Sequence, residues 1–328
     1  MKLINNPMMV VWIGIFLYAC GPSEKTLDLV KRAKTMYGTL PKEMPGSEND
    51  TPELIALGKK LYFDASLSDN NTKSCNTCHN ILEGKGGTDN LETSIGSAGK
   101  NEERNTPTVL NAGFQAALFW DGRARDLSDL AKKHLLNPTE MGNTNEMLIE
   151  EKLSAIEDYK NLFLKAYPKD STITLDKIGN ALAAFQRTLR TQDRFDDFIS
   201  GNYKAFSDKE VRGLEVFMTT GCATCHNGPL FGGRMFMKLG VVNPYENKED
   251  TGKFKITNQE GDMYVFKVPS LRNVALTAPY YHDGKVKTLE EAVKKMAYLQ
   301  LGKDLAQEEV DSLVSFLGTL TDIERLKK

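Results

Sequence analysis

The sequence predicts a mainly α-helical protein with long loops, and two observations support this fold class. Residues 174–189 and 307–317 each place apolar side chains on one face of a helix, whereas the apolar–polar alternation of β-strands is scarce. Residues 80–108 and 227–268 are polar and rich in glycine and asparagine. Loops of this length in a compact domain need something to organise them, and a large cofactor would do so.

The composition limits the classes of protein to consider. The 328 residues, 40% of them hydrophobic, suffice for two domains of ordinary size, although one large domain also fits this length. There are 42 basic and 44 acidic residues, which gives a formal net charge of -2. This balance provides no field that would attract nucleic acid or an anionic membrane surface.

The amino terminus has the pattern of an export signal. Lys2 precedes an apolar run over residues 8–19, which is long enough for a signal-peptide core and too short to span a bilayer. The run ends in "LYAC", which resembles the lipobox of bacterial lipoproteins. We expect residues 1–20 to be a lipoprotein signal peptide, with Cys20 lipidated and the protein held at a membrane by acyl chains alone. The alternative is an ordinary secretory signal, and the protein is exported in either case.

The next segment reads as a connection to the globular part. Residues 21–50 are polar, with several prolines and little periodicity, so we expect a tether with one short helix around residues 27–37. Thr51 and Pro52 suit the N-cap and the first position of a helix. The folded part therefore starts at residue 51.

The cysteines provide the strongest chemical signal. Of five, all except Cys20 form C-x-x-C pairs, each followed at once by histidine. These motifs are Cys75, Cys78 and His79, and Cys222, Cys225 and His226. In c-type cytochromes the two thiols bond covalently to haem and the adjacent histidine ligates the iron. A zinc site formed by four thiolates would leave both histidines unexplained, and a thioredoxin-like redox pair would be expected within a βαβ pattern, which neither motif has. We predict two covalent c-type haems.

The sixth coordination position decides what each haem does. Methionine opposite histidine raises the reduction potential and suits electron transfer, whereas an open position permits chemistry with oxygen species. One capping box, Ser207 with Glu210, precedes the second motif, and another, Thr288 with Glu291, begins the helix that carries Met296. Met296 is a candidate ligand on a rigid mounting, and a methionine that fills the core is the alternative. The other methionines after the second motif are Met235, Met237 and Met263.

Long motifs in a fixed order resemble the bacterial dihaem cytochrome c peroxidases and the related enzymes that mature the tryptophan-derived quinone of methylamine dehydrogenase. The resemblance covers residues 54–320. Its motifs are "ALGKKLYFDASLS", "CNTCHN", "RNTPTVLNAGFQAALFWDGRA", "AFQRTL", "GCATCHNGPLFGG", "VPSLRNVALTAPYYHDG" and "TLEEAV" with the methionine and "LQLG" that follow it.

The resemblance implies a fold and a function. It implies two cytochrome c-like helical domains, each around one haem: a peroxidatic domain over residues 51–200 and an electron-transfer domain over residues 201–328. The first haem would reduce hydrogen peroxide. The second would receive electrons from a small cytochrome c or cupredoxin. A calcium ion between the domains and a homodimer are also implied.

Individual positions match roles in the family. Met296 matches the methionine ligand of the second haem, where the quinone-forming relatives have tyrosine, and this favours the peroxidase branch. Trp120 matches the tryptophan between the haems. Glu140 matches the distal glutamate, which shuttles a proton during cleavage of peroxide. The residues that match the calcium positions are Asn105, through its side chain, and Thr277 and Pro279, through backbone carbonyls.

One position departs from the family pattern. The family usually carries a histidine after "TSIG" that caps the peroxidatic haem, and this chain has Ser97 there, which is a poor iron ligand. The first haem is then either permanently open, or His134 reaches the distal pocket as a substitute ligand or a second acid–base group. A surface role for His134 is the plain alternative. His282 matches a residue near the second haem and is expected to be structural or to line the electron path.

Two other functions remain open on the sequence alone. A relative could use the same haems to oxidise a protein side chain or a small organic molecule, and Met296 speaks against that. A plain dihaem electron carrier would keep both irons six-coordinate in every state, whereas a peroxidase needs one iron that peroxide can reach.

Overall fold

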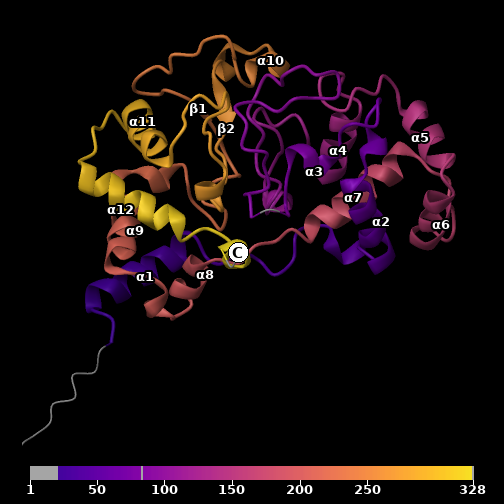
Figure 1. Cartoon of the computed structure of the whole chain (residues 1–328). Coiled ribbons are helices and arrows are strands. Elements are labelled where there is room, and N and C mark those ends of the chain that lie inside the picture. Colours follow the sequence, from indigo (N-terminus) through magenta and orange to yellow (C-terminus); the bar gives the residue numbers. More distant parts are fainter. Residues whose placement is uncertain (1–20, 83, 327–328) are drawn as a thin grey trace, which may run out of the picture.

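A computed structural model describes residues 21–82 and 84–326 of the chain (Figure 1). The predicted signal peptide, residues 1–20 with Cys20, lies outside the described residues. The structure is mainly helical, as predicted, and Figure 1 shows its helices in two lobes with long loops between them. The described helices, apart from short 3-10 turns, are α1 (Glu24–Met36), α2 (Pro52–Phe63), α3 (Cys75–Cys78), α4 (Leu127–Leu135), α5 (Glu146–Ser154), α6 (Glu157–Ala166), α7 (Leu175–Arg187), α8 (Arg194–Ile199), α9 (Asp208–Thr220), α10 (Phe254–Thr257), α11 (Leu289–Leu301), α12 (Gln307–Gly318) and α13 (Ile323–Leu326). None of the described helices is both long enough and apolar enough to span a bilayer.

Helix starts follow the predicted caps. The Thr51 hydroxyl accepts a hydrogen bond of 3.2 Å from the Leu54 amide at the start of α2, and Pro52 occupies the first turn. The two predicted capping boxes are both formed, at the starts of α9 and α11. The predicted helices over residues 174–189 and 307–317 are confirmed as α7 and α12.

Each lobe has its own core. In the first, α2 and α4 to α7 bury a set of apolar side chains that includes Leu57, Leu61, Phe163 and Ile178. In the second, α1, α8, α9 and α12 bury a cluster of aromatic residues around Phe316. The predicted boundary after residue 200 places α8 in the first domain, but its buried phenylalanines pack in the second core.

The two lobes repeat one helix arrangement. In each, the helix before the C-x-x-C-H motif crosses the lobe's last long helix at a glycine. A Cβ at Gly58 of α2 would lie 1.8 Å from the Ala181 carbonyl oxygen of α7, and a Cβ at Gly213 of α9 would lie 1.9 Å from the Ser312 carbonyl oxygen of α12. Only glycine permits backbones to approach so closely. The repeat supports two related helical units, each carrying one motif.

The predicted tether over residues 21–50 is wrong, because α1 packs in the second lobe. Leu29, Val30 and Ala33 are buried on one face of α1, and the Tyr37 ring stacks on Phe231 with centroids 4.1 Å apart. Figure 1 shows α1 in indigo beside α8 and α9. The short apolar stripe lies among lysines and threonines, so the segment reads as polar although it covers an aromatic core.

Strands are few among the described residues. β1 (Phe236–Lys238) and β2 (Val265–Lys267) form one antiparallel pair, in which Phe236 faces Lys267. The pair belongs to the long loop after the second motif, and it delivers Lys267 to the space between the lobes.

Candidate functional site

The first C-x-x-C-H motif lies in the wall of a cavity in the first lobe. Its cysteines begin and end α3, and both carry free thiols. His79 follows at the C-cap, where its carbonyl accepts a hydrogen bond of 2.6 Å from the Tyr62 hydroxyl. Burial and the neighbouring His134 lower the pKa of His79 to about 4, so the imidazole is neutral, as a metal ligand must be. Two thiols and a neutral imidazole facing one cavity fit a covalent haem.

A carboxylate and a second histidine line the same cavity. His134 lies in the last turn of α4, and Glu140 follows in the next loop. His134 Nδ1 and Glu140 Oε2 are hydrogen-bonded, and Asn137 Nδ2 donates to Glu140 Oε1 at 2.8 Å. The structure therefore brings the two predicted distal residues together and holds the Glu140 carboxylate at both oxygens.

The carboxylates of this cavity differ in their affinity for protons. Burial raises the pKa of Glu140, but the charge and hydrogen bond of His134 and the Asn137 amide outweigh burial, so the pKa lies below its usual value. Glu102 lines the same cavity, and its Oε1 has no hydrogen-bond partner among the described residues. Burial and the charge of Glu140 raise the pKa of Glu102 to about 7. Glu140 therefore gives up its proton more readily than an ordinary glutamate, and Glu102 holds its proton more tightly.

Ser97, at the position where the family usually has a histidine ligand, sits behind Glu140. Its backbone amide donates to the Glu140 carbonyl at 2.8 Å. Its hydroxyl is buried with no hydrogen-bond partner among the described residues, and Ser97 is not among the residues that line the cavity.

The second C-x-x-C-H motif lines a cavity in the second lobe. His226 is buried, and its Nδ1 lies 3.0 Å from the Phe231 carbonyl oxygen, a contact that fixes the ring and leaves Nε2 for a metal. Met296 lines this cavity from α11, as predicted, and Met237 lines it from β1. The described residues that line this cavity include a single Asp, Glu, Lys or Arg side chain, which is that of Lys267.

Trp120 and Lys267 line both cavities and lie between them. Trp120 Nε1 donates to the Asn105 carbonyl at 2.8 Å, and the Trp120 carbonyl accepts from the Lys267 amide at 2.7 Å. The indole is therefore held by a backbone carbonyl of the first lobe, and the Trp120 main chain is held by a backbone amide of the second. Burial lowers the pKa of Lys267 to about 8, and its ammonium group donates to Gln115 Oε1.

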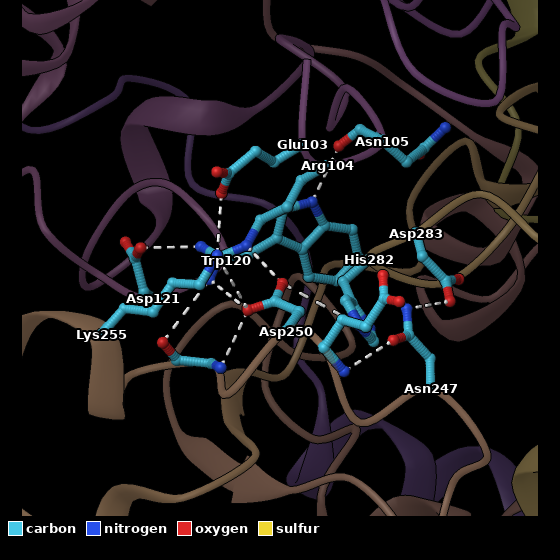
Figure 2. A network of polar contacts seen from close by, with 12 residues as sticks. Glu103, Arg104, Asn105, Trp120, Asp121, Asn247, Asp250, Lys255, His282 and Asp283 are labelled. Carbon is cyan, nitrogen blue, oxygen red and sulfur yellow. Dashed lines mark hydrogen bonds and ion pairs between the residues drawn. The ribbon is translucent and has the colours of Figure 1, made fainter. Parts of the chain in front are cut away.

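A polar network joins the lobes beside Trp120 (Figure 2). Arg104 donates to both oxygens of Asp250, at 2.6 and 2.8 Å, and to Asp121 at 2.7 Å. His282 lines the second cavity, and its Nε2 lies 3.9 Å from Asp250 Oδ2. Arg104 comes from the first lobe and Asp250 from the second. Their bidentate ion pair therefore fixes the relative position of the two lobes around Trp120.

The three predicted calcium positions lie where the lobes meet. The Asn105 amide donates to the His282 carbonyl at 2.7 Å, and Asn105 Nδ2 donates to the carbonyls of Leu91 and Glu92 at 2.9 and 3.2 Å. None of these contacts uses Asn105 Oδ1, the side-chain oxygen that the predicted calcium site would need. Thr277 and Pro279 would contribute carbonyl oxygens, which calcium accepts. The described residues contain no group of three or more His, Cys, Asp or Glu placed to hold a metal.

Three residues of these cavities had no signal in the sequence. Glu102 lies in a polar loop, Lys267 in a short strand, and Arg123 follows the "FWDG" motif. The Arg123 guanidinium lies 3.4 Å from the centroid of the Phe119 ring, in cation–π contact. Each is a single charged side chain brought to the cavity by tertiary structure, without a local spacing pattern.

Comparison with known proteins gives consistent matches. A family model described as di-haem cytochrome c peroxidase matches residues 52–204. The cytochrome c551 peroxidase of Nitrosomonas europaea is 44% identical over 276 residues, which cover 83% of this chain and 81% of that protein. The enzyme of the same name from Pseudomonas aeruginosa is 44% identical over 271 residues, covering 81% and 78%. A solved structure of a MauG-like protein associated with microbial copper homeostasis has a TM-score of 0.78 at 30% identity, covering 88% of this chain and 95% of that chain.

Proposed function

The chain belongs to the di-haem cytochrome c peroxidase family, and we propose that it reduces hydrogen peroxide to water with electrons from a small exported cytochrome c or cupredoxin. The observation that carries this proposal is the difference between the two cavities. The first combines a C-x-x-C-H motif with the partly buried carboxylate of Glu140, whereas the second combines its motif with Met296.

The haems are held by the two motifs. Cys75 and Cys78 would attach the first haem and His79 would ligate its iron, while Cys222, Cys225 and His226 would do the same for the second, with Met296 as a further candidate ligand. When bound, the first haem supplies an iron that binds peroxide, and the second supplies a store for one electron at high potential.

Glu140 moves the proton that cleavage of peroxide requires. Peroxide bound through one oxygen carries a proton on that oxygen, and the departing oxygen needs a proton to leave as water. A Glu140 carboxylate oxygen accepts the first proton and returns it to the departing oxygen, a general acid–base step. The lowered pKa of Glu140 keeps it ionised and ready to accept.

Trp120 carries electrons between the haems. Trp120 borders both cavities, and the hydrogen bond from its Nε1 to the Asn105 carbonyl orients the ring. The pair of Arg104 with Asp250 and a calcium ion bound by Asn105, Thr277 and Pro279 keep the two lobes in register around this path. His282 lines the second cavity on that path.

The protein works outside the cytoplasm, as a lipoprotein anchored through Cys20. Since α1 begins at Glu24 and packs in the second lobe, an anchor at Cys20 would hold the electron-transfer lobe close to the membrane surface. A homodimer is the proposed assembly.

The test uses the purified holoprotein with a reduced small cytochrome c. We expect oxidation of that cytochrome to depend on hydrogen peroxide and to require both haems. The double variant Cys75→Ala with Cys78→Ala should lose peroxide reduction. The double variant Cys222→Ala with Cys225→Ala should lose oxidation of the donor. Peroxide-dependent oxidation no faster than that by free haem would refute the proposal.

A further inference from the structure

His134 occupies the side of the first cavity that faces His79. The centroids of the two imidazole rings are 6.0 Å apart and the ring planes are inclined by 70°. Two imidazole–metal bonds of roughly 2 Å each, added to the two distances from ring nitrogen to ring centre, give a centroid separation of about 6 Å. The space between the rings therefore fits one metal ion bound by both. A histidine that only relayed protons to a bound peroxide would have to stand farther away, since two oxygen atoms must fit between it and the iron.

The hydrogen bond of His134 has the form expected of a metal ligand. A ligating histidine almost always uses its other ring nitrogen to contact a carboxylate or a backbone carbonyl, which fixes the ring and increases its basicity. His226 has this arrangement with the Phe231 carbonyl. His134 has it with Glu140, because Nδ1 is engaged by Oε2 and Nε2 is left over.

The position of His134 also allows it to leave. The side chain is 30% exposed, whereas that of Glu140 is 15% exposed. His134 lies in the last turn of α4, and the chain leaves the helix after Leu135. The neighbouring ring is Phe119, with centroids 4.8 Å apart, so the imidazole is bounded by an apolar wall on one side and by solvent on another. A change of side-chain rotamer is enough to move it outward.

We propose that His134 Nε2 is the displaceable sixth ligand of the first haem iron in the resting protein, in place of the histidine that Ser97 replaces. This inference rests on the proposed function, because it requires the first haem to be bound through His79. It couples the access of peroxide to the iron with the proton transfer by Glu140. While His134 Nε2 ligates the iron, His134 Nδ1 is hydrogen-bonded to the Glu140 carboxylate. When the His134 side chain moves outward, it therefore opens the iron and also frees the carboxylate for proton transfer.

The test compares the oxidised holoprotein with His134→Gly by electron paramagnetic resonance and optical absorption. We expect the wild-type first haem to be low-spin with two nitrogen ligands. In His134→Gly it should become high-spin, and added imidazole should restore the low-spin signal by filling the space of the lost side chain. His134→Leu should be high-spin and resist this rescue, since leucine fills that space. The signal of the second haem serves as the check on folding and should stay the same in every variant.

Ser97→Ala is the matched control, because it removes the hydroxyl at the position where relatives have a ligand. It should leave the low-spin signal in place. The inference is overturned if the wild-type first haem is already high-spin, or if it is low-spin and remains so in His134→Gly. Neither result touches the proposed function, which would instead fail if both wild type and the opened His134→Gly variant lacked peroxide reduction.

Discussion

The two cavities share an attachment motif and a helix pair, but their remaining walls differ in charge. The first is lined by Glu102, Glu140, Arg123 and His134. Among the described residues, the second is lined mainly by apolar side chains and Met296, with Lys267 as its one Asp, Glu, Lys or Arg side chain. Because the attachment motifs are the same, the proposed difference in chemistry depends on the remaining residues: ionisable groups would move protons for peroxide in the first cavity, and a thioether among apolar residues would suit electron transfer in the second.

The largest effect should come from removing the carboxylate that the second cavity lacks. Glu140→Gln keeps the shape of the side chain but cannot accept a proton, so peroxide turnover should fall roughly 10²–10⁴-fold. Steady-state oxidation of a reduced cytochrome c measures it, with haem content and the second haem's potential as checks. Glu151→Gln, on an exposed face of α5, is the control and should have no effect. Turnover within a few-fold of wild type in Glu140→Gln would remove the main distinction between the cavities.

The second lobe also contains buried charged residues that do not line its cavity. Their contribution to stability can be tested separately from the chemistry of the haem site. Arg272 is fully buried and donates to Asp193 at 2.5 Å and to Asp196 at 2.9 Å. Asp193→Ala removes one of the two carboxylates that pair with this buried cation, so the free energy of unfolding should fall by about 3–5 kcal/mol. Denaturant unfolding followed by the second haem's absorption measures this change. The reduction potential should hardly change, because none of the three residues lines the cavity.

The control for this variant is an exposed ion pair in the same lobe. Glu290 pairs with Lys294 on the surface of α11. Because exposed ion pairs contribute little to stability, Glu290→Ala should therefore change the free energy of unfolding far less than Asp193→Ala does. If Asp193→Ala were as mild as this, the buried triad would not be what stabilises the second lobe.

The next effect concerns Met296, the proposed ligand of the second haem, and the reduction potential of that haem. Because methionine raises the reduction potential relative to histidine, Met296→His should lower the potential of the second haem by a sizeable part of the roughly 0.8 V range that axial ligands cover. Spectroelectrochemical titration measures it, and donor-supported turnover should slow accordingly. Met237→Leu, in the same cavity, should leave the potential nearly unchanged. The opposite result would assign the ligand to Met237.

The parts of the molecule that the sequence predicted are those with a local pattern. Haem attachment requires two thiols and a histidine at fixed spacing, so each motif is visible in five consecutive residues of the sequence. The helices α7 and α12 follow from periodicity, and α2, α9 and α11 from their caps. Distal residues such as Glu140 carry no local pattern, and they were found through resemblance to a family.

The parts that were missed depend on tertiary structure. The helix α1 was expected in a tether because its apolar stripe is short, and its partners Phe195 and Phe231 are far away in the sequence. Glu102 reaches the first cavity through a loop with no periodic pattern. Lys267 reaches both cavities through a three-residue strand. Single charged residues of this kind look like surface positions until the loops are folded over the haem sites.

The smallest predicted effect is a loss of stability caused by a charged residue of the first cavity, Glu102, as the pH rises. Burial and the charge of Glu140 raise the pKa of Glu102 from 4.5 to about 7, so the folded protein binds this proton more tightly than the unfolded chain does. The contribution of Glu102 to stability is therefore complete below about pH 4.5 and is lost as the pH rises through about 7. Glu102→Gln stays neutral and should not show this loss. The free energy of unfolding of wild type and variant, measured from about pH 4 to about pH 8, should diverge in favour of the variant as the pH rises. A difference that does not change with pH would show that Glu102 titrates normally, and that the first cavity maintains its second carboxylate without a penalty.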